Sequence, residues 1–113
     1  MNVQMEKATL LAEQLKSFID LVYRSYNKET HFEFHHDKVY RLKSLVDEYR
    51  FNIISEELLR VNKFVWDEKV TPVLVDRVKE KLVTIDEYVE SNYQDLYLFS
   101  VRLSNIKSLL ATF

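Results

Sequence analysis

The sequence contains no glycine and a single proline, Pro72. Tight turns with a positive φ angle normally use glycine, and β-rich chains need many such turns. The absence of glycine therefore argues against a β-rich fold. It also excludes a glycine-rich phosphate-binding loop. What remains favoured is a set of long helices joined by short, simple connections.

Cysteine is also absent, which excludes disulfides, thiolate nucleophiles and cysteine-ligated zinc. This absence is consistent with a reducing compartment, so we expect a cytoplasmic protein. Long uncharged apolar runs are missing as well. The first apolar residues are interrupted by Glu6, Lys7, Glu13 and Lys16, which argues against a signal peptide and against a membrane span.

The chain lacks an excess of either charge. Its 16 basic and 18 acidic residues give a net charge of −2 and are interspersed along the sequence. Nucleic-acid binding depends on a concentrated basic surface, so we do not expect a nucleic-acid partner. With 113 residues, 47% of them hydrophobic, the chain is predicted to form one globular domain that covers residues 1–113.

The apolar residues that are present recur every three or four positions, which is typical of amphipathic helices. This spacing predicts an all-α fold with helices at residues 3–26, 31–65, 72–90 and 92–112. Because the connections are short, neighbouring helices should run antiparallel, as an up-down-up-down four-helix bundle. The core is expected to include, among others, Leu42, Leu82, Phe99 and Leu103.

Three sequence patterns predict where helices begin. Thr30 and Glu33 have the spacing of a capping box, and so do Ser91 and Gln94, with Asn92 as a competing cap. The third pattern is a threonine followed by Pro72. Threonine is a good N-cap and proline is well suited to the first helical position, so Thr71 is predicted to cap the third helix.

The second predicted helix is unusually long. It would span roughly 50 Å if it were straight. Its apolar stripe changes phase by one residue at the adjacent pair Ile53 and Ile54 and continues to Val65. We therefore expect a bend near Arg50–Ser55. The alternative is a complete split, with Asn52 or Ser55 as the new cap.

The three histidines, His31, His35 and His36, lie within six residues of each other. On a helix, His31 and His35 would share a face and could chelate one metal ion. Glu33 and His36 also have the Glu-x-x-His spacing of di-metal carboxylate bundles. Those proteins need a second such motif, which this chain lacks. We therefore predict no metal and no cofactor, and we expect the cluster to lie at a partly exposed helix start.

The sequence has no cysteine nucleophile, and no serine lies near both a histidine and a carboxylate, so nothing in it supports nucleophilic catalysis. We predict a non-enzymatic protein that binds an unknown protein partner or a second copy of itself. Trp66, Tyr88 and Tyr97 are the expected contact residues, because exposed aromatic side chains often anchor interfaces. The alternative is a bundle that binds a small molecule or a metal through its histidine cluster.

The order of features resembles the YppE-like proteins, small uncharacterised four-helix bundles of Gram-positive bacteria. The resemblance rests on a first helix ending near Tyr26, then Phe32-Glu33-Phe34, a long second helix, and Lys63-Phe64-Val65 before Lys69-Val70. Asn62 and Trp66 depart from it, since proline and histidine are expected there. The resemblance implies a cytoplasmic bundle and no known activity. Bacteriocin-immunity proteins are a second, less similar class, since they often carry a basic bias.

Overall fold

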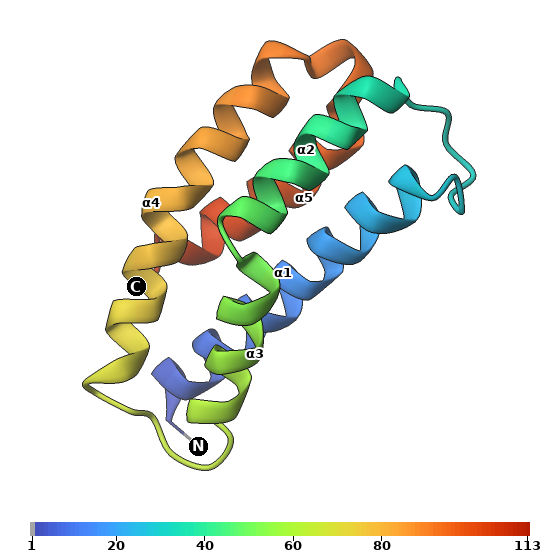
Figure 1. Ribbon diagram of the computed structural model, residues 1–113. Helices are drawn as coiled ribbons and strands as arrows, with labels where there is room; N and C mark the ends of the chain where they lie inside the picture. Colours follow the sequence, from blue (N-terminus) through green and yellow to red (C-terminus); the bar gives the residue numbers. More distant parts are fainter. Residues whose placement is uncertain (1) are drawn as a thin grey trace.

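The computed structural model describes residues 2–113, and within them the chain forms five α-helices (Figure 1). They are α1 (Val3–Tyr26), α2 (His36–Glu48), α3 (Phe51–Val61), α4 (Val70–Ser91) and α5 (Tyr93–Leu110). No strand occurs among these residues, which confirms the all-α prediction. The predicted number of four helices is wrong, because the second predicted helix is divided in two.

The five helices surround one apolar core in a particle that measures 41 × 23 × 22 Å. α2 and α3 follow one another beside α1 (Figure 1). On its other side, α1 contacts α5, and α5 in turn contacts α4, which also packs on α3 and α2. No helix in residues 2–113 is long and apolar enough to cross a membrane.

The predicted apolar stripes of α1, α4 and α5 form this core. Leu42, Leu82, Phe99 and Leu103 are all buried, as expected. Phe18 from α1 meets Phe99 from α5 edge to face, with ring centroids 6.3 Å apart. Two side chains assigned to the stripe of the second predicted helix, Ile53 and Val65, are instead exposed.

The second predicted helix is interrupted at Arg50, which has a left-handed conformation with φ 58° and ψ 41°. Its N–H donates to the carbonyl of Asp47 at 3.1 Å, and its own carbonyl accepts from the N–H of Ile54 at 3.1 Å. One residue thus ends α2 and starts α3. The alternative of a complete split near Arg50–Ser55 is confirmed, but the predicted caps are wrong. Neither Asn52 nor Ser55 caps the new helix; the Ser55 hydroxyl donates to the Asn52 carbonyl.

A left-handed residue also ends α1, again without glycine. Lys28 has a φ of 60°; its N–H donates to the Ser25 carbonyl, and the N–H of Glu29 donates to the Arg24 carbonyl at 2.7 Å. This pair of bonds is the Schellman motif, which satisfies the last carbonyls of a helix. The motif turns the chain into a loop of residues 27–35.

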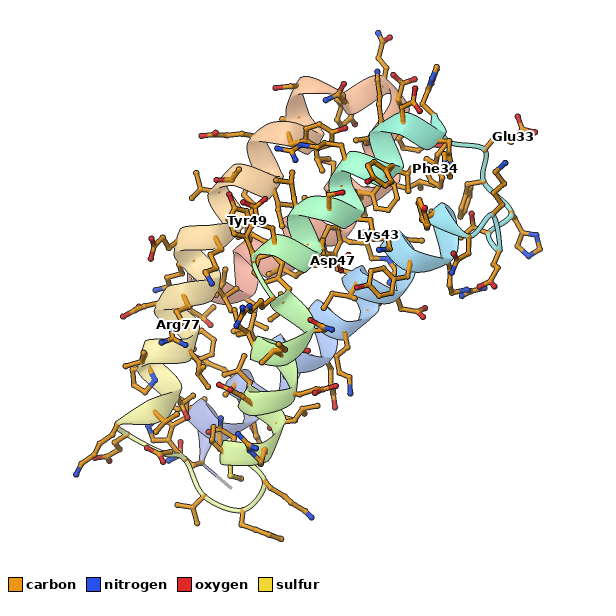
Figure 2. The ribbon with its side chains drawn as sticks, in the orientation of Figure 1. Glu33, Phe34, Lys43, Asp47, Tyr49 and Arg77 are labelled. Atoms are coloured by element: carbon orange, nitrogen blue, oxygen red, sulfur yellow. The ribbon has the colours of Figure 1, made fainter. Side chains whose placement is uncertain are left out.

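The helix predicted to start at residue 31 therefore starts at His36. The capping box of Thr30 and Glu33 does not form, because the Thr30 hydroxyl donates to the Phe32 carbonyl instead. Figure 2 shows Glu33 pointing away from the helices. Phe34 packs on the core residue Phe99 with ring centroids 4.9 Å apart, and this contact holds the segment outside a helix.

The start of α4 also differs from the prediction. Asp67 provides the cap, since its Oδ1 accepts from the N–H groups of Lys69 at 2.9 Å and Val70 at 2.8 Å. Thr71 is fully buried inside the first turn. Its hydroxyl donates to Oδ1 of Asn62 at 3.0 Å. The predicted Thr71 cap is wrong because this buried partner takes the hydroxyl.

The capping box predicted at Ser91 and Gln94 is wrong too. Ser91 is the last residue of α4, and Asn92 alone separates α4 from α5. The Asn92 side chain does not cap α5; its Nδ2 donates back to the Tyr88 carbonyl at 2.9 Å. α5 is kinked in its first turn at Leu96, with φ −123° and ψ 22°.

Candidate functional site

The three histidines do not form the helical pair that their spacing suggested. His31 lies in the loop of residues 27–35, and His35 immediately precedes α2. His36 begins α2, and its ring stacks on Tyr26 at 5.1 Å. Within residues 2–113, no group of three or more histidine, cysteine, aspartate or glutamate side chains is placed to hold a metal ion.

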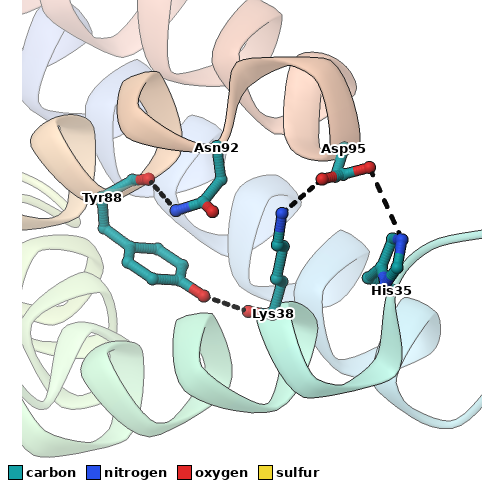
Figure 3. A network of polar contacts seen from close by, with 5 residues as sticks. All are labelled: His35, Lys38, Tyr88, Asn92 and Asp95. Carbon is teal, nitrogen blue, oxygen red and sulfur yellow. Dashed lines mark hydrogen bonds and ion pairs between the residues drawn. The ribbon is translucent and has the colours of Figure 1, made fainter.

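A polar network joins the start of α2 to the turn between α4 and α5 (Figure 3). The Lys38 ammonium donates to Oδ2 of Asp95. The Nε2 atom of His35 lies 3.8 Å from the other carboxylate oxygen of Asp95. Tyr88 donates its hydroxyl to the Lys38 carbonyl at 2.9 Å. Residues from three helices are thereby fixed at one end of the molecule.

The electrostatics of this network favour a structural role. The hydrogen bond from Lys38, together with the charges of Lys38 and His35, lowers the pKa of Asp95 below its ordinary value. Burial raises the pKa of Tyr88 above its ordinary value. A general acid or base that works at neutral pH needs a pKa near 7. Both of these pKa values move away from neutrality.

A second cluster joins α1 to α2 and contains Lys43 and Asp47, which Figure 2 labels on the same helix. The Lys43 ammonium lies 2.8 Å from Oδ2 of Asp47 and 5.0 Å from the ring centroid of Tyr23. The Tyr23 hydroxyl donates to the same carboxylate. The hydrogen bond to Asp47 is the main cause that raises the pKa of Tyr23 and of Lys43. Neither change brings a group toward neutrality.

The predicted contact residues Trp66 and Tyr88 do not lie on one surface. Trp66 lies in the α3–α4 connection, partly buried, beside Pro72, Val75 and Phe113 in a shallow cavity of about 310 Å³. Tyr88 lies near the other end of α4. The helix rises about 27 Å between Val70 and Tyr88, so the structure does not bring Trp66 and Tyr88 together.

The two tyrosines differ in what they can offer a partner. Tyr88 is half-buried and its hydroxyl is engaged by the Lys38 carbonyl. Tyr97 lies in α5 and is 47% exposed. Of the three predicted residues, Tyr97 is therefore the one with the most side chain free for contact.

Phe64 and Val65 were not identified as contact residues from the sequence. They are 79% and 71% exposed, the largest fractions among the exposed large apolar residues of the described range. They lie in the loop between α3 and α4, with the Lys63 ammonium 5.2 Å from the Phe64 ring centroid. Their spacing from Val61 fits a continuing helical stripe, so the sequence placed them in the second predicted helix and not in an exposed loop. The polar Asn62 and the cap-forming Asp67 were the signals of a loop.

The loop that carries Phe64 and Val65 is held at both ends. Before it, the Asn62 side chain is buried and donates from Nδ2 to the Leu58 carbonyl at 2.9 Å. After it, Asp67 caps α4, and Thr71 is bonded to Asn62 across the loop at 3.0 Å. The apolar tip is thus presented on a closed, hydrogen-bonded frame.

No protein-family model, curated protein or solved structure matches this chain. The resemblance to the YppE-like proteins stays a prediction. The function is therefore argued from the surfaces and contacts of the chain itself.

Proposed function

We propose that this chain is a non-enzymatic helical protein that binds a protein partner through the loop tip formed by Phe64 and Val65. The observation that carries the proposal is the exposure of these two adjacent apolar side chains, 79% and 71%. Phenylalanine and valine prefer burial, and burying both against a partner would contribute roughly 3–5 kcal/mol. The gain needs a partner with an apolar pocket.

The frame of the loop supports this proposal. Binding costs free energy when a mobile segment must be ordered, and a segment held in one conformation avoids much of that cost. The buried hydrogen bond between Asn62 and Thr71 closes the loop at its base. Asp67 fixes the last residues of the loop by accepting two backbone N–H groups.

The charges around the tip also fit a protein interface. Lys63, Asp67, Glu68 and Lys69 flank the apolar pair and carry both signs. An apolar centre inside a polar rim is the usual composition of a protein–protein interface. A mixed rim does not favour a strongly basic or acidic partner such as nucleic acid.

The same proposal includes the finer architecture and the location. α2 and α3 together would take the place of one helix in an antiparallel four-helix bundle, since both lie along α1. The absence of cysteine supports a cytoplasmic location, and the resemblance to the YppE-like proteins implies a bacterial protein. We propose no enzymatic activity, because the two polar clusters that join the helices hold pKa values away from neutrality.

The proposal can be tested by affinity capture from the native host with three immobilised proteins: wild type, Phe64→Glu and the matched control Val101→Glu. Val101 is exposed on α5, so the control places the same charge on another surface. We expect wild type and Val101→Glu to retain a protein that Phe64→Glu loses. The purified partner should then shift the fluorescence of Trp66, the only tryptophan, which neighbours the tip.

Two results would count against the proposal. If every retained protein binds Phe64→Glu as well as wild type, the loop tip is not the anchor. If no protein is retained and a small metabolite co-purifies in stoichiometric amount, a small-molecule-binding bundle becomes the better explanation. Circular dichroism of Phe64→Glu serves as the folding control, because an exposed loop residue should leave helix content unchanged.

A further inference from the structure

A cavity of about 360 Å³ lies where the loop of residues 27–35 joins the end of α1 to the start of α2. Figure 1 shows this loop at the end of the molecule opposite the loop that carries Phe64 and Val65. Ser25 of α1 and His36 of α2 line the cavity, and the loop supplies its other walls. Sites for small organic ligands usually have volumes of about 300–1,000 Å³, so the cavity is large enough for one.

The Ser25 side chain is a buried polar group without a partner in the wall of this cavity. It is only 6% exposed, and its hydroxyl oxygen forms no hydrogen bond within residues 2–113. Nearly all buried polar side chains in proteins have a hydrogen-bond partner, because leaving one unpaired is unfavourable. A ligand that enters the cavity with a polar group leading would supply this partner.

Two features of the cavity favour a negatively charged group. Lys28 lines it and forms no ion pair among the residues that the structure describes. α2 begins at His36 without a side-chain cap, so the positive end of its dipole lies at the cavity. The end of α1 offers little opposition, because the carbonyls of Arg24 and Ser25 already accept backbone hydrogen bonds.

The acidic residues nearby limit how much negative charge the cavity can accept. Glu33 also lines it, although Figure 2 shows its side chain pointing away from the helices. Asp37 lies in the first turn of α2. A dianion such as phosphate would be repelled by both carboxylates, with one ammonium to balance it. A carboxylate ligand carries a single charge and therefore fits better.

Two aromatic rings give the cavity an apolar wall. The ring centroids of Phe32 and Phe34 lie 6.2 Å apart, and both residues line the cavity. Phe34 is held from behind by Phe99, whereas Phe32 is 50% exposed. An aromatic ring in the cavity would cover Phe32, and contacts between tilted aromatic rings are favourable.

We propose that this cavity binds a small aromatic carboxylate. Its oxygens accept hydrogen bonds from the Ser25 hydroxyl and the Lys28 ammonium, and its ring packs on Phe32. The site lies at the other end of the molecule from the loop tip of Phe64 and Val65, so the proposal does not rest on the proposed function.

Titration of the full chain with benzoate, followed by amide chemical shifts in solution NMR, tests the proposal. Benzoate should cause saturable shifts in the loop of residues 27–35 and leave the amides of residues 62–69 unchanged. Benzamide has nearly the same shape without the charge, and acetate has the charge without the ring. Each should bind at least about 10-fold more weakly than benzoate, because each lacks one of the two contacts.

Variants of the two proposed donors make the test specific. Ser25→Ala should weaken benzoate binding at least about 5-fold, since it removes a hydrogen bond to a charged group. The same variant should unfold at the wild-type Tm or higher, because the hydroxyl has no partner within the described chain. Lys28→Asn should also weaken binding, and asparagine tolerates the φ of 60° at this position. The matched control Lys16→Gln, exposed on α1, should bind benzoate as wild type does.

Four results would overturn the proposal and leave the loop-tip proposal standing. The first is the absence of saturable shifts at tens of millimolar benzoate. The second is benzamide or acetate binding as tightly as benzoate. The third is unchanged binding in Ser25→Ala or Lys28→Asn. The fourth is a lower Tm for Ser25→Ala, which would show that the hydroxyl serves the fold and not a ligand.

Discussion

Replacing Thr71 with valine should destabilise the protein although valine has almost the same shape. Thr71 is fully buried, and its hydroxyl donates at 3.0 Å to Oδ1 of Asn62, which is itself only 2% exposed. Valine removes the donor and leaves a buried carbonyl oxygen without its partner. An unsatisfied buried acceptor lowers the free energy of unfolding by about 1–3 kcal/mol. At this chain length, each kcal/mol lowers the Tm by roughly 3–6 °C.

The double variant Asn62→Leu/Thr71→Val tests whether the destabilisation comes from the lost hydrogen bond between these two side chains. It replaces both partners with apolar groups, a change that can be nearly neutral. The Leu58 carbonyl, which accepts from Nδ2 of Asn62, keeps the Asn62 backbone N–H as a donor at 3.3 Å. We therefore expect the double variant to be more stable than the sum of the single changes implies, with a coupling of about 1 kcal/mol or more.

Urea unfolding, followed by circular dichroism and by the fluorescence of the nearby Trp66, measures these free energies. Thr84→Val is the matched control, because Thr84 is exposed on the same helix; it should change stability by less than about 0.5 kcal/mol. If Thr71→Val unfolds like this control, or if the two single changes simply add, the buried pair does not act as described.

Three further predictions follow from particular residues. Arg50→Gly should raise the free energy of unfolding by about 0.5–1 kcal/mol in urea titrations, since it relieves the left-handed strain but makes the unfolded chain more flexible; a lower stability would contradict this account. Leu82→Ala should lower it by about 2–5 kcal/mol because this core side chain is buried; unchanged thermal unfolding would mean that α4 has been packed on the wrong face. Two backbone hydrogen bonds, from Val70 and Lys69, lower the pKa of Asp67 below its ordinary value. A lowered carboxyl pKa stabilises the fold above the unfolded pKa and loses this effect as pH falls through the folded pKa. The stability gap between wild type and Asp67→Ala should therefore narrow below about pH 4 in thermal unfolding scans, whereas a constant gap would exclude the charged cap.

The buried faces could be predicted because apolar spacing directly reflects which side of a helix packs. Leu15 and Phe18, Val78 and Leu82, and Leu103 and Ile106 are all buried as expected. The break near Arg50 was predicted from the phase change at Ile53 and Ile54, but the left-handed conformation of Arg50 that makes the break was not. A lysine or arginine in the left-handed region leaves no mark in the sequence, whereas glycine would have done so.

The helix starts were predicted wrongly because tertiary contacts overrode local patterns. Thr71 has the sequence context of a cap, yet a buried Asn62 takes its hydroxyl. Thr30 has the context of a capping box, yet Phe34 is held by Phe99. Val65 fits a helical stripe, yet the chain has already left the helix at Val61. Each of these outcomes depends on residues distant in the sequence, which spacing alone does not reveal.

The position of α1 between α3 and α5 has a consequence for synthesis on the ribosome. One side of α1 can be covered as soon as α3 has emerged, but the side that includes Phe18, which packs on Phe99, stays open until α5 is complete. Nascent chains with uncovered apolar surface are prone to aggregation and to capture by chaperones. A chain arrested after Ser91 would therefore be exposed to proteolysis, and a slow codon before Tyr93 would lengthen that exposure.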